Sequence, residues 1–275
     1  MGLRIATNVP SLNVQRNIEK TSVETSQSFA RLSSGSRINR ASDDAAGLSI
    51  SQNLEAQTRG LKQAQRNAND GISLVQTAEG GMNEVSNILI RLRELGVQAA
   101  SDTVGDTERG FINKEYESLK QEVDRIASST NFNGTQLLSG EGKALSFHVG
   151  AFAGEENVIH FDTASSNVKT GALGIDGLNV MSKEGAAGSL ATIDQAINKL
   201  NENRSALGAL QNRLHSTSNS LGVAFENMSE AKSRIADTDI AHETSVLMKN
   251  SILQNAGISV LSQANSAPQA AMKLL

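Results

Sequence analysis

The chain has 275 residues, a formal net charge of −4 and a pI near 5.7; 38% of its residues are hydrophobic, 3% are aromatic, and it has no cysteine. The acidic balance argues against a nucleic-acid-binding protein, which needs a basic surface, and the lack of cysteine excludes disulfides, thiolate catalysis and thiolate metal sites. So few aromatic residues suit an elongated molecule with an aliphatic seam better than a compact globule.

The N-terminal segment, residues 1–42, shows a weak helical pattern. Its loose apolar stripe consists of Leu12, Ile18, Phe29 and Leu32. Pro10 is tolerable at the start of a helix, because its missing N–H would be unpaired there. The first 30 residues contain no continuous apolar core of the kind that a secretory signal requires, so we expect no cleaved signal peptide.

Heptad spacing predicts a long helix over residues 45–99. One apolar line runs through Leu54, Leu61, Ala68, Val75, Met82 and Leu89, and a second line runs through Ile50, Gln57, Ala64, Gly71, Ala78, Val85, Leu92 and Ala99. The small side chains of the second line allow a neighbouring helix to approach closely. Asp43 and Asp44 suit the N-terminus of this helix, where carboxylates accept free N–H groups.

A shorter helix is predicted between Gly105 and about residue 130. Its apolar positions are Ile112, Tyr116, Leu119, Val123 and Ile126. From residue 131 to residue 188 the pattern changes, because Asn133–Gly134 and many further glycines punctuate short apolar runs such as 145–149 and 158–161. This punctuation is typical of hairpins and loops with modest strand content.

A third long helix is predicted over residues 189–235. Its seven-residue series is Ile193, Leu200, Leu207, Leu214, Leu221, Met228 and Ile235, which indicates coiled-coil packing. The apolar stripes of the three predicted helices can cover one another in an antiparallel bundle. The predicted fold class is therefore mainly α: a long antiparallel coiled-coil or helical bundle with a small β-hairpin region.

The C-terminal segment, residues 236–275, is apolar on nearly every helical face. The apolar positions include Leu247, Leu253, Ile258, Val260 and Leu261. Asn250 to Met272 carries no charge, but ten of its 23 residues are Asn, Gln or Ser, and the cost of desolvating them argues against a membrane span. Because the chain has no further large core to cover this helix, we expect both ends to pack against other copies.

Self-assembly follows from this uncovered apolar surface. Each Leu or Ile side chain removed from water contributes about 1.5–3 kcal/mol, which offsets part of the cost of ordering the ends, about 1–2 kcal/mol per residue. The balance becomes favourable only when neighbours supply further contacts. Contacts between unlike surfaces that do not close into a ring yield a helical filament.

Three segments resemble the bacterial flagellins. They are LSSGSRINRASDDAAGLSIS at 32–51, NDGISLVQTAEGGMNEVSNILIRLRELGVQA at 69–99, and 233–275 with SRIADTDIAHETS and ILQNAGISVLSQAN. The resemblance covers roughly residues 1–140 and 190–275, and its motifs agree in order and spacing. It implies a subunit of the flagellar filament, in a short form without the extra outer domains of many flagellins.

The resemblance implies a layered organisation with paired terminal helices. Residues 1–42 and 236–275 would form the two halves of an inner-tube helical domain. Residues 43–130 would supply the N-terminal helices of a bundle domain, 131–188 its β-hairpin and loop region, and 189–235 its C-terminal helix.

The resemblance also implies partners and a location. The protein would be exported by the flagellar type III route without a cleaved signal, and it would work outside the cell in the flagellar filament. Its partners would be further flagellin subunits, an export chaperone, and hook-associated and cap proteins. An innate immune receptor would recognise the monomer through positions matched here by Arg91, Leu95 and Glu115. The alternative for Arg91 and Glu115 is ordinary charge pairing between helices or subunits.

Chemical motifs are incomplete throughout the sequence. His242–Glu243 begins a zinc motif that lacks its second histidine, since Val246 stands in that place. His148, His160 and Asp162 would be a surface turn cluster more readily than a metal site. Asn133–Gly134–Thr135 matches a glycosylation triplet but is more simply a turn. We therefore expect no catalytic, cofactor-binding or metal site, no cofactor and no enzymatic activity.

Three functional hypotheses remain to be separated. The first is a self-assembling filament subunit, and the second is a hook–filament junction (hook-associated) protein, which would share the coiled-coil ends but assemble in few copies. The third is a metal-dependent hydrolase that uses His148 and His160. We favour the first, without nucleic-acid binding or membrane insertion.

Overall fold

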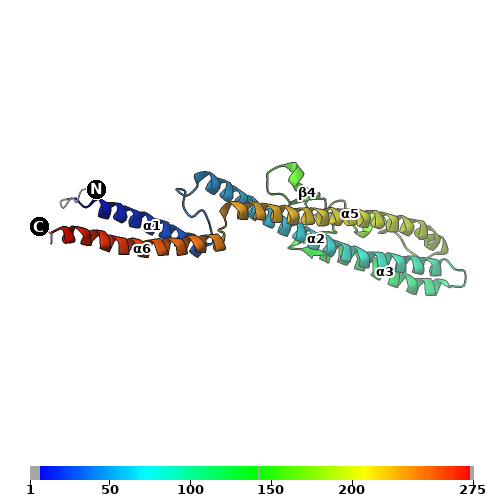
Figure 1. The fold of residues 1–275 in the computed structure, drawn as a ribbon. Helices are drawn as coiled ribbons and strands as arrows, with labels where there is room; N and C mark the ends of the chain where they lie inside the picture. The colour runs from blue at the N-terminus through cyan, green and yellow to red at the C-terminus, as the bar shows by residue number, and fades with distance from the viewer. Residues whose placement is uncertain (1–6, 142, 273–275) are drawn as a thin grey trace. The chain divides into compact units, whose positions relative to one another are not determined.

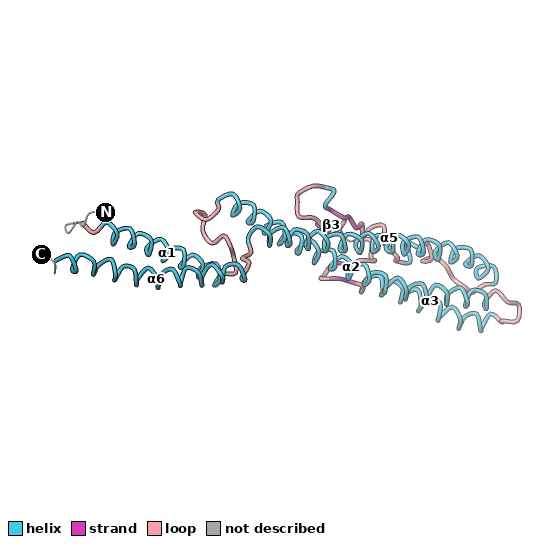
Figure 2. Tube along the Cα trace, viewed as in Figure 1, coloured by secondary structure: helices cyan, strands magenta, loops and turns pink. Residues whose placement is uncertain are grey.

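The computed structural model describes residues 7–141 and 143–272, with side chains up to residue 266. The helices are α1 (Val9–Ser34), α2 (Ala45–Ala99), α3 (Asp106–Ser129), α4 (Thr170–Leu173), α5 (Lys183–Ala236) and α6 (Ile240–Met272) (Figure 1). The strands are β1 (Asn131–Phe132), β2 (Thr135–Gln136), β3 (Leu145–His148) and β4 (Val158–Phe161), with a 3-10 turn at Glu155–Asn157. Helix dominates the trace, and the strands are short (Figure 2).

The chain divides into two compact units. Unit 1 comprises residues 1–57 and 227–275, and unit 2 comprises residues 58–226. Both divisions fall inside the two longest helices, α2 and α5, whereas the sequence suggested divisions at residues 42/43 and 235/236. A continuous helix can leave one set of packing partners for another without a break in its backbone hydrogen bonds, so sequence punctuation does not mark these points.

The core of unit 2 is the seam between α2, α3 and α5. On α2 the first heptad line is buried from Leu61 to Leu89 and the second from Ala64 to Ala99, while Ile193 to Leu221 form the buried line of α5. The α2 and α5 helices are antiparallel, because Arg93 Nε lies 2.7 Å from Asp194 Oδ1 and Asn69 lies beside Ser218. The antiparallel bundle predicted from heptad spacing is confirmed.

The heptad lines lose their burial in unit 1. Ile50, predicted on the second line of α2, is half exposed, and Gln57, Met228 and Ile235 are only partly covered. The prediction for Ile50 was wrong because a heptad line is buried only where a partner helix faces it. These positions lie in the part of each helix that belongs to unit 1.

The two hairpins pack against the bundle within unit 2. At the β1–β2 turn Asn133 and Gly134 have φ values of 49° and 79°, the left-handed pair of a two-residue hairpin. β3 pairs with β4 from Leu145↔Phe161 to His148↔Val158, and Asn67 Nδ2 donates to the carbonyl of His148 at 2.9 Å. A β-carbon added to Gly71 would lie 3.3 Å from the Phe147 ring, so that glycine lets the hairpin lie close to α2.

Helix starts depend on side-chain caps. Asp44 caps α2, since its Oδ1 accepts from the Gly47 N–H at 2.8 Å. Asp43 instead accepts from the amides of Asn39 and Arg40 in the preceding loop, so the expectation that both carboxylates cap α2 was half right. α5 begins at Lys183, six residues before the predicted 189, because Ser182 caps it by accepting from the Gly185 N–H.

No helix in the described residues is both long enough and apolar enough to span a membrane.

Tyr116 makes the bundle sensitive to alkaline pH. Its ring is fully buried, and burial raises the pKa of its hydroxyl to about 12, compared with about 10 in an unfolded chain. The folded state therefore keeps its proton longer, and this stabilisation is complete below pH ~10 and lost as pH rises through ~12. We expect the unfolding free energy to fall by about 2–3 kcal/mol over this window from this group alone.

The measurement is urea denaturation of the native chain and Tyr116→Phe between pH 9 and 12. Over this range the unfolding free energy of Tyr116→Phe should fall by about 2–3 kcal/mol less than that of the native chain. Because Tyr116 is the only tyrosine, the tyrosinate absorbance reports its titration directly. Equal pH dependence of the two proteins would contradict the prediction.

Candidate assembly surface

The α1–α6 pair of unit 1 buries a few polar side chains and leaves many aliphatic side chains exposed. The two helices lie side by side and antiparallel (Figure 1), because Asn8 Nδ2 donates to the Ala264 carbonyl at 2.9 Å and Arg31 reaches Glu243 at the other end. Among the side chains of these helices that the structure describes, four polar ones are buried: Ser11, Ser28, Glu243 and Asn250. An ordinary coiled coil has an apolar seam, whereas here the buried polar residues share the seam with partly covered apolar ones such as Ile18, which faces Gly257 of α6.

The predicted assembly residues divide into two groups. Half or more of the surface of Phe29 (59%), Leu12, Ile258 and Val260 (50%) is exposed, and Leu253 is exposed to nearly the same extent. Ile18, Leu32, Leu247 and Leu261 are partly covered. Further large apolar side chains on these helices are also exposed, namely Val9, Val23, Ile240, Met248 and Ile252.

A shallow groove runs along one side of the α1–α6 pair. Its volume is about 460 Å³, and Val14, Ile18, Leu253 and Val260 supply its apolar lining. Gly257 forms part of its wall, where an added β-carbon would lie 2.9 Å from Ile18 Cγ1. Asn17, Lys20, Thr21 and Glu24 also line the groove, so it offers both apolar and charged contacts to another helix.

Backbone hydrogen bonds between residues 35–37 and 236–238, here called the backbone clamp, join the C-terminal end of α1 to the start of α6. Ser36 and Asp237 form an antiparallel bridge, the Arg37 N–H donates to the Ala236 carbonyl at 2.7 Å, and the Thr238 N–H donates to the Gly35 carbonyl at 2.9 Å. Gly35 has a φ of 70°, so it ends α1 in the left-handed conformation that glycine adopts readily. The clamp thus places the end of α1 beside the junction of α5 and α6.

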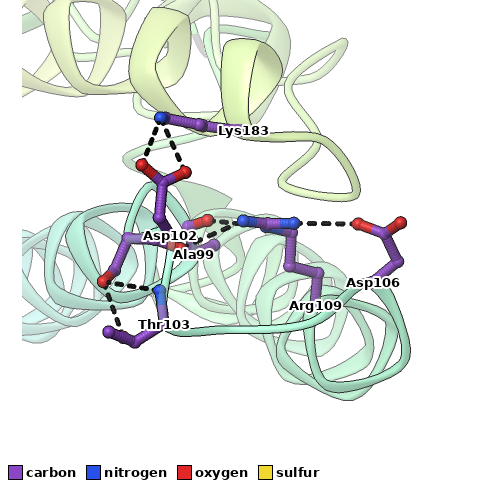
Figure 3. Close-up of polar contacts among 7 residues, drawn as sticks. Ala99, Asp102, Thr103, Asp106, Arg109 and Lys183 are labelled. Atoms are coloured by element: carbon purple, nitrogen blue, oxygen red, sulfur yellow. Dashed lines mark hydrogen bonds and ion pairs between the residues drawn. The ribbon is translucent and has the colours of Figure 1, made fainter.

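The turn between α2 and α3 is held by buried and exposed cations (Figure 3). Arg109 is largely buried; it donates to the carbonyls of Ala99 and Ser101 at 2.9 and 3.0 Å and pairs with Asp106. Lys183 at the start of α5 contacts Asp102 at 2.7 Å, and its hydrogen bond lowers the pKa of that carboxyl. Arg109 thus satisfies carbonyls that the end of α2 leaves without helical partners.

The three residues matched to immune recognition do not share one surface. Arg91 is exposed and binds Glu115 at 2.9 Å and Glu94 at 2.9 Å, and these hydrogen bonds raise the pKa of its guanidinium. Leu95 is 1% exposed and belongs to the bundle core. Its expected place on a surface with Arg91 is therefore corrected: the boundary of the buried stripe passes between residues that are one helical turn apart.

The histidines considered as metal ligands in the sequence lie in ordinary surface and helix positions. His148 and His160 are exposed on the β3–β4 hairpin, and His160 contacts Ser146 at 3.0 Å and Glu155 at 3.4 Å. Glu243, next to His242, is buried against Arg31 at 3.6 Å. Across residues 7–141 and 143–272, no three His, Asp or Glu side chains gather closely enough to hold a metal ion.

Sequence reasoning missed the polar residues that stabilise this fold from inside. Arg109, Lys120, Glu243 and Asn250 are all buried, and Lys120 Nζ donates to the carbonyl of Leu178 at 3.0 Å and also to that of Asp176. Polar side chains are common on exposed faces, so their types and spacing contain no signal for burial. Only the packed structure identifies them.

Comparison with known proteins decides the family. The model of the bacterial flagellin N-terminal helical region matches residues 5–143, and that of the bacterial flagellin C-terminal helical region matches residues 190–275. The chain belongs to the flagellin family. A flagellin of Halalkalibacterium halodurans is 40% identical over 98% of both chains, and flagellar filament core protein flaB2 of Brachyspira hyodysenteriae is 39% identical over 98% of this chain and 99% of its own.

A solved structure agrees with the fold. The crystal structure of Bacillus cereus flagellin is 32% identical, with a TM-score of 0.51 over 57% of this chain and 88% of that chain. Residues 144–189 lie between the two matched regions and hold the β3–β4 hairpin, α4 and the start of α5. This is therefore a short flagellin without extra outer domains, in a family of structural proteins that polymerise into the extracellular flagellar filament.

Proposed function

We propose that this flagellin assembles by burying the outward aliphatic faces of α1 and α6 between copies. The observation that carries the proposal is the packing of the pair, which buries Asn250 and Glu243 and leaves Val260, Ile252 and Phe29 exposed. Large exposed apolar surface is typical of protein interaction sites. In a homopolymer, the surface that covers these faces belongs to a second copy of the chain. The α1–α6 pair of that copy carries the same exposed aliphatic side chains.

Growth is head-to-tail in this proposal. The apolar side chains are spread around α6, on several faces, so a single two-fold contact would cover only some of them. Repeated contacts between different faces of successive copies cover more and propagate as a helical filament. The uncharged Asn, Gln and Ser side chains between residues 250 and 266 suit hydrogen bonding between subunits and the lining of a tube.

Electron microscopy of the purified chain with precipitant or filament seeds tests this proposal. We expect long filaments that lengthen with protein concentration. A short assembly that stops growing would favour the second hypothesis, a hook–filament junction protein. Turnover of a hydrolysable substrate that requires metal, and is lost on replacing His148 and His160, would favour the third.

Export and accessory partners belong to the same proposal. A chain with uncovered apolar ends benefits from a chaperone before export, and the flagellar type III route would carry it through a narrow channel without a cleaved signal. Hook-associated proteins and the cap protein would meet it at the two ends of the filament. Co-purification of the full chain with each of these proteins, compared with a variant cut at residue 236, tests which partners need α6.

Recognition by an innate immune receptor is a second proposed role, limited to exposed residues. Arg91 and Glu115 offer opposite charges on neighbouring helices, each about half exposed, whereas Leu95 lies in the core. We expect Arg91→Ala to weaken binding of the monomer to a receptor ectodomain about tenfold, because a charge-assisted contact is lost.

Surface plasmon resonance with the purified monomer measures this effect. Arg125→Ala is the matched control, since Arg125 is also an exposed arginine paired with a nearby carboxylate, Glu122. Equal affinity of the native chain and both variants would remove Arg91 from the receptor surface.

A further inference from the structure

The α6 helix has no single apolar face that defines how it should pair. Its exposed aliphatic residues are spread over the several faces of the helix that α1 does not cover; they are Ile240, Met248, Ile252, Leu253, Ile258 and Val260. Apolar attraction is non-directional and scales with area. Burial alone would therefore allow α6 to pair through several faces, in several registers, and with α6 of another copy.

The polar residues of the α1–α6 seam remove this ambiguity. Glu243 is 7% exposed and lies 3.6 Å from Arg31 of α1. At the far end of the pair, Ser11 Oγ donates to Asn265 Oδ1 and Asn8 Nδ2 to the Ala264 carbonyl, both at 2.9 Å. A seven-residue slide of α6 would bring position 250 or 236 opposite Arg31 and leave the buried Glu243 without this cation, which is strongly unfavourable.

Asn250 is a buried residue of the seam that destabilises the α1–α6 pair. It is 3% exposed, and its Nδ2 has no hydrogen-bond partner among the residues that the structure describes. A buried polar atom without a partner costs free energy. In coiled coils a single buried asparagine lowers stability but selects register and partner.

We propose that Arg31, Glu243 and Asn250 are specificity residues that direct α6 to α1 of its own chain and away from α6 of other copies. Pairing of two α6 helices through this face would bury two Glu243 carboxylates without Arg31. Pairing of α6 with α1 gives Glu243 its cation and leaves the aliphatic faces outside. The role proposed for these residues rests on the proposed assembly function, because the outer aliphatic faces are the surfaces that would bind further copies.

The absence of cysteine from the native chain makes cross-linking a clean test. Ile18 and Gly257 face each other across the seam, so Ile18→Cys with Gly257→Cys brings two β-carbons into disulfide range. Oxidation of the unpolymerised full chain traps this pair even when it forms briefly. The ratio of intramolecular to intermolecular product, read on a non-reducing gel, therefore reports selectivity and not stability.

With the native seam we expect the intramolecular product to dominate. Asn250→Leu should raise the intermolecular share several-fold, and Glu243→Gln should raise it to a smaller extent because it keeps the side-chain shape. The matched control is Asn255→Leu, the same substitution at an exposed position of α6, which should leave the ratio unchanged. A separate single variant, Gln254→Cys, should form α6–α6 dimers readily only when combined with Asn250→Leu.

The outcomes separate this inference from the assembly proposal. An unchanged ratio in both seam variants, or an equal rise in Asn255→Leu, would overturn the specificity role. Circular dichroism shows whether each variant keeps its helices, and Glu243→Gln provides the test if Asn250→Leu does not. Because cross-linking uses the unpolymerised chain, native selectivity without filament growth would overturn the assembly proposal alone.

Discussion

Replacing Val260 with aspartate should abolish filament growth and leave the bundle of unit 2 folded. Val260 is 50% exposed and lines the α1–α6 groove with Ile18 and Leu253, so in the unpolymerised chain an aspartate there keeps contact with water. Between subunits the same carboxylate would be desolvated at an effective cost of several kcal/mol, of which Lys20, in the same groove but already beside Glu24, would offset only a part. Because this cost recurs at every subunit, a long filament should not form.

Electron microscopy after seeding measures the loss, and circular dichroism with thermal unfolding checks the fold. Leu253→Asp, in the same groove, should behave alike. Val223→Asp is the matched control, because Val223 is an exposed valine of α5 in unit 2 and makes no part of the α1–α6 pair. Normal filaments from Val260→Asp would refute burial of this groove between subunits. Loss of filaments in the control would show that unit 2 also takes part in subunit contacts.

Removing residues 236–275 should give a soluble helical protein that does not polymerise. The cut deletes α6 and with it the ion pair to Arg31, the backbone clamp to Gly35–Arg37 and the α6 side of the groove. The core of unit 2 contains no residue from this segment. We expect the cooperative unfolding of the bundle to persist, because its buried seam from Leu61 to Ala99 and from Ile193 to Leu221 is intact.

Size-exclusion chromatography, circular dichroism and electron microscopy on the shortened chain provide the measurement. The full-length chain, prepared and seeded identically, is the control for assembly. Filament growth by the shortened chain would contradict a role for α6. Loss of the cooperative transition would show instead that the bundle depends on the terminal pair.

The long helices could be predicted because their signals are local and repeated. The 45–99 helix agrees with α2 at both ends, since Asp44 provides a start signal and the heptads from Leu61 to Leu89 sustain one buried face. The start of α5 was placed six residues late because Gly185 and Gly188 resemble loop residues. The cap at Ser182 and the burial of Ala186 and Ser189 outweigh the low helix propensity of glycine.

The candidate site was less predictable than the fold. Exposure of Phe29, Leu253 and Val260 follows from an apolar pattern that no partner within the chain can cover. The burial of Asn250 and Glu243 does not follow from any pattern, because a helix that is apolar all round does not indicate which side faces its neighbour. Leu95 shows the same limit: helical spacing placed it near Arg91, but only packing shows on which side of the core boundary it lies.

By itself the sequence determined that this chain is a helical coiled-coil protein with apolar ends in need of neighbours, and its motifs pointed to the flagellins. Hydrophobic periodicity and capping residues act within one or two helical turns, so they can be read along the chain. The tertiary structure alone decided which faces of α1 and α6 meet and which polar residues are buried between them. That choice depends on directional contacts between residues more than 200 positions apart, such as Arg31 and Glu243, which no local pattern contains.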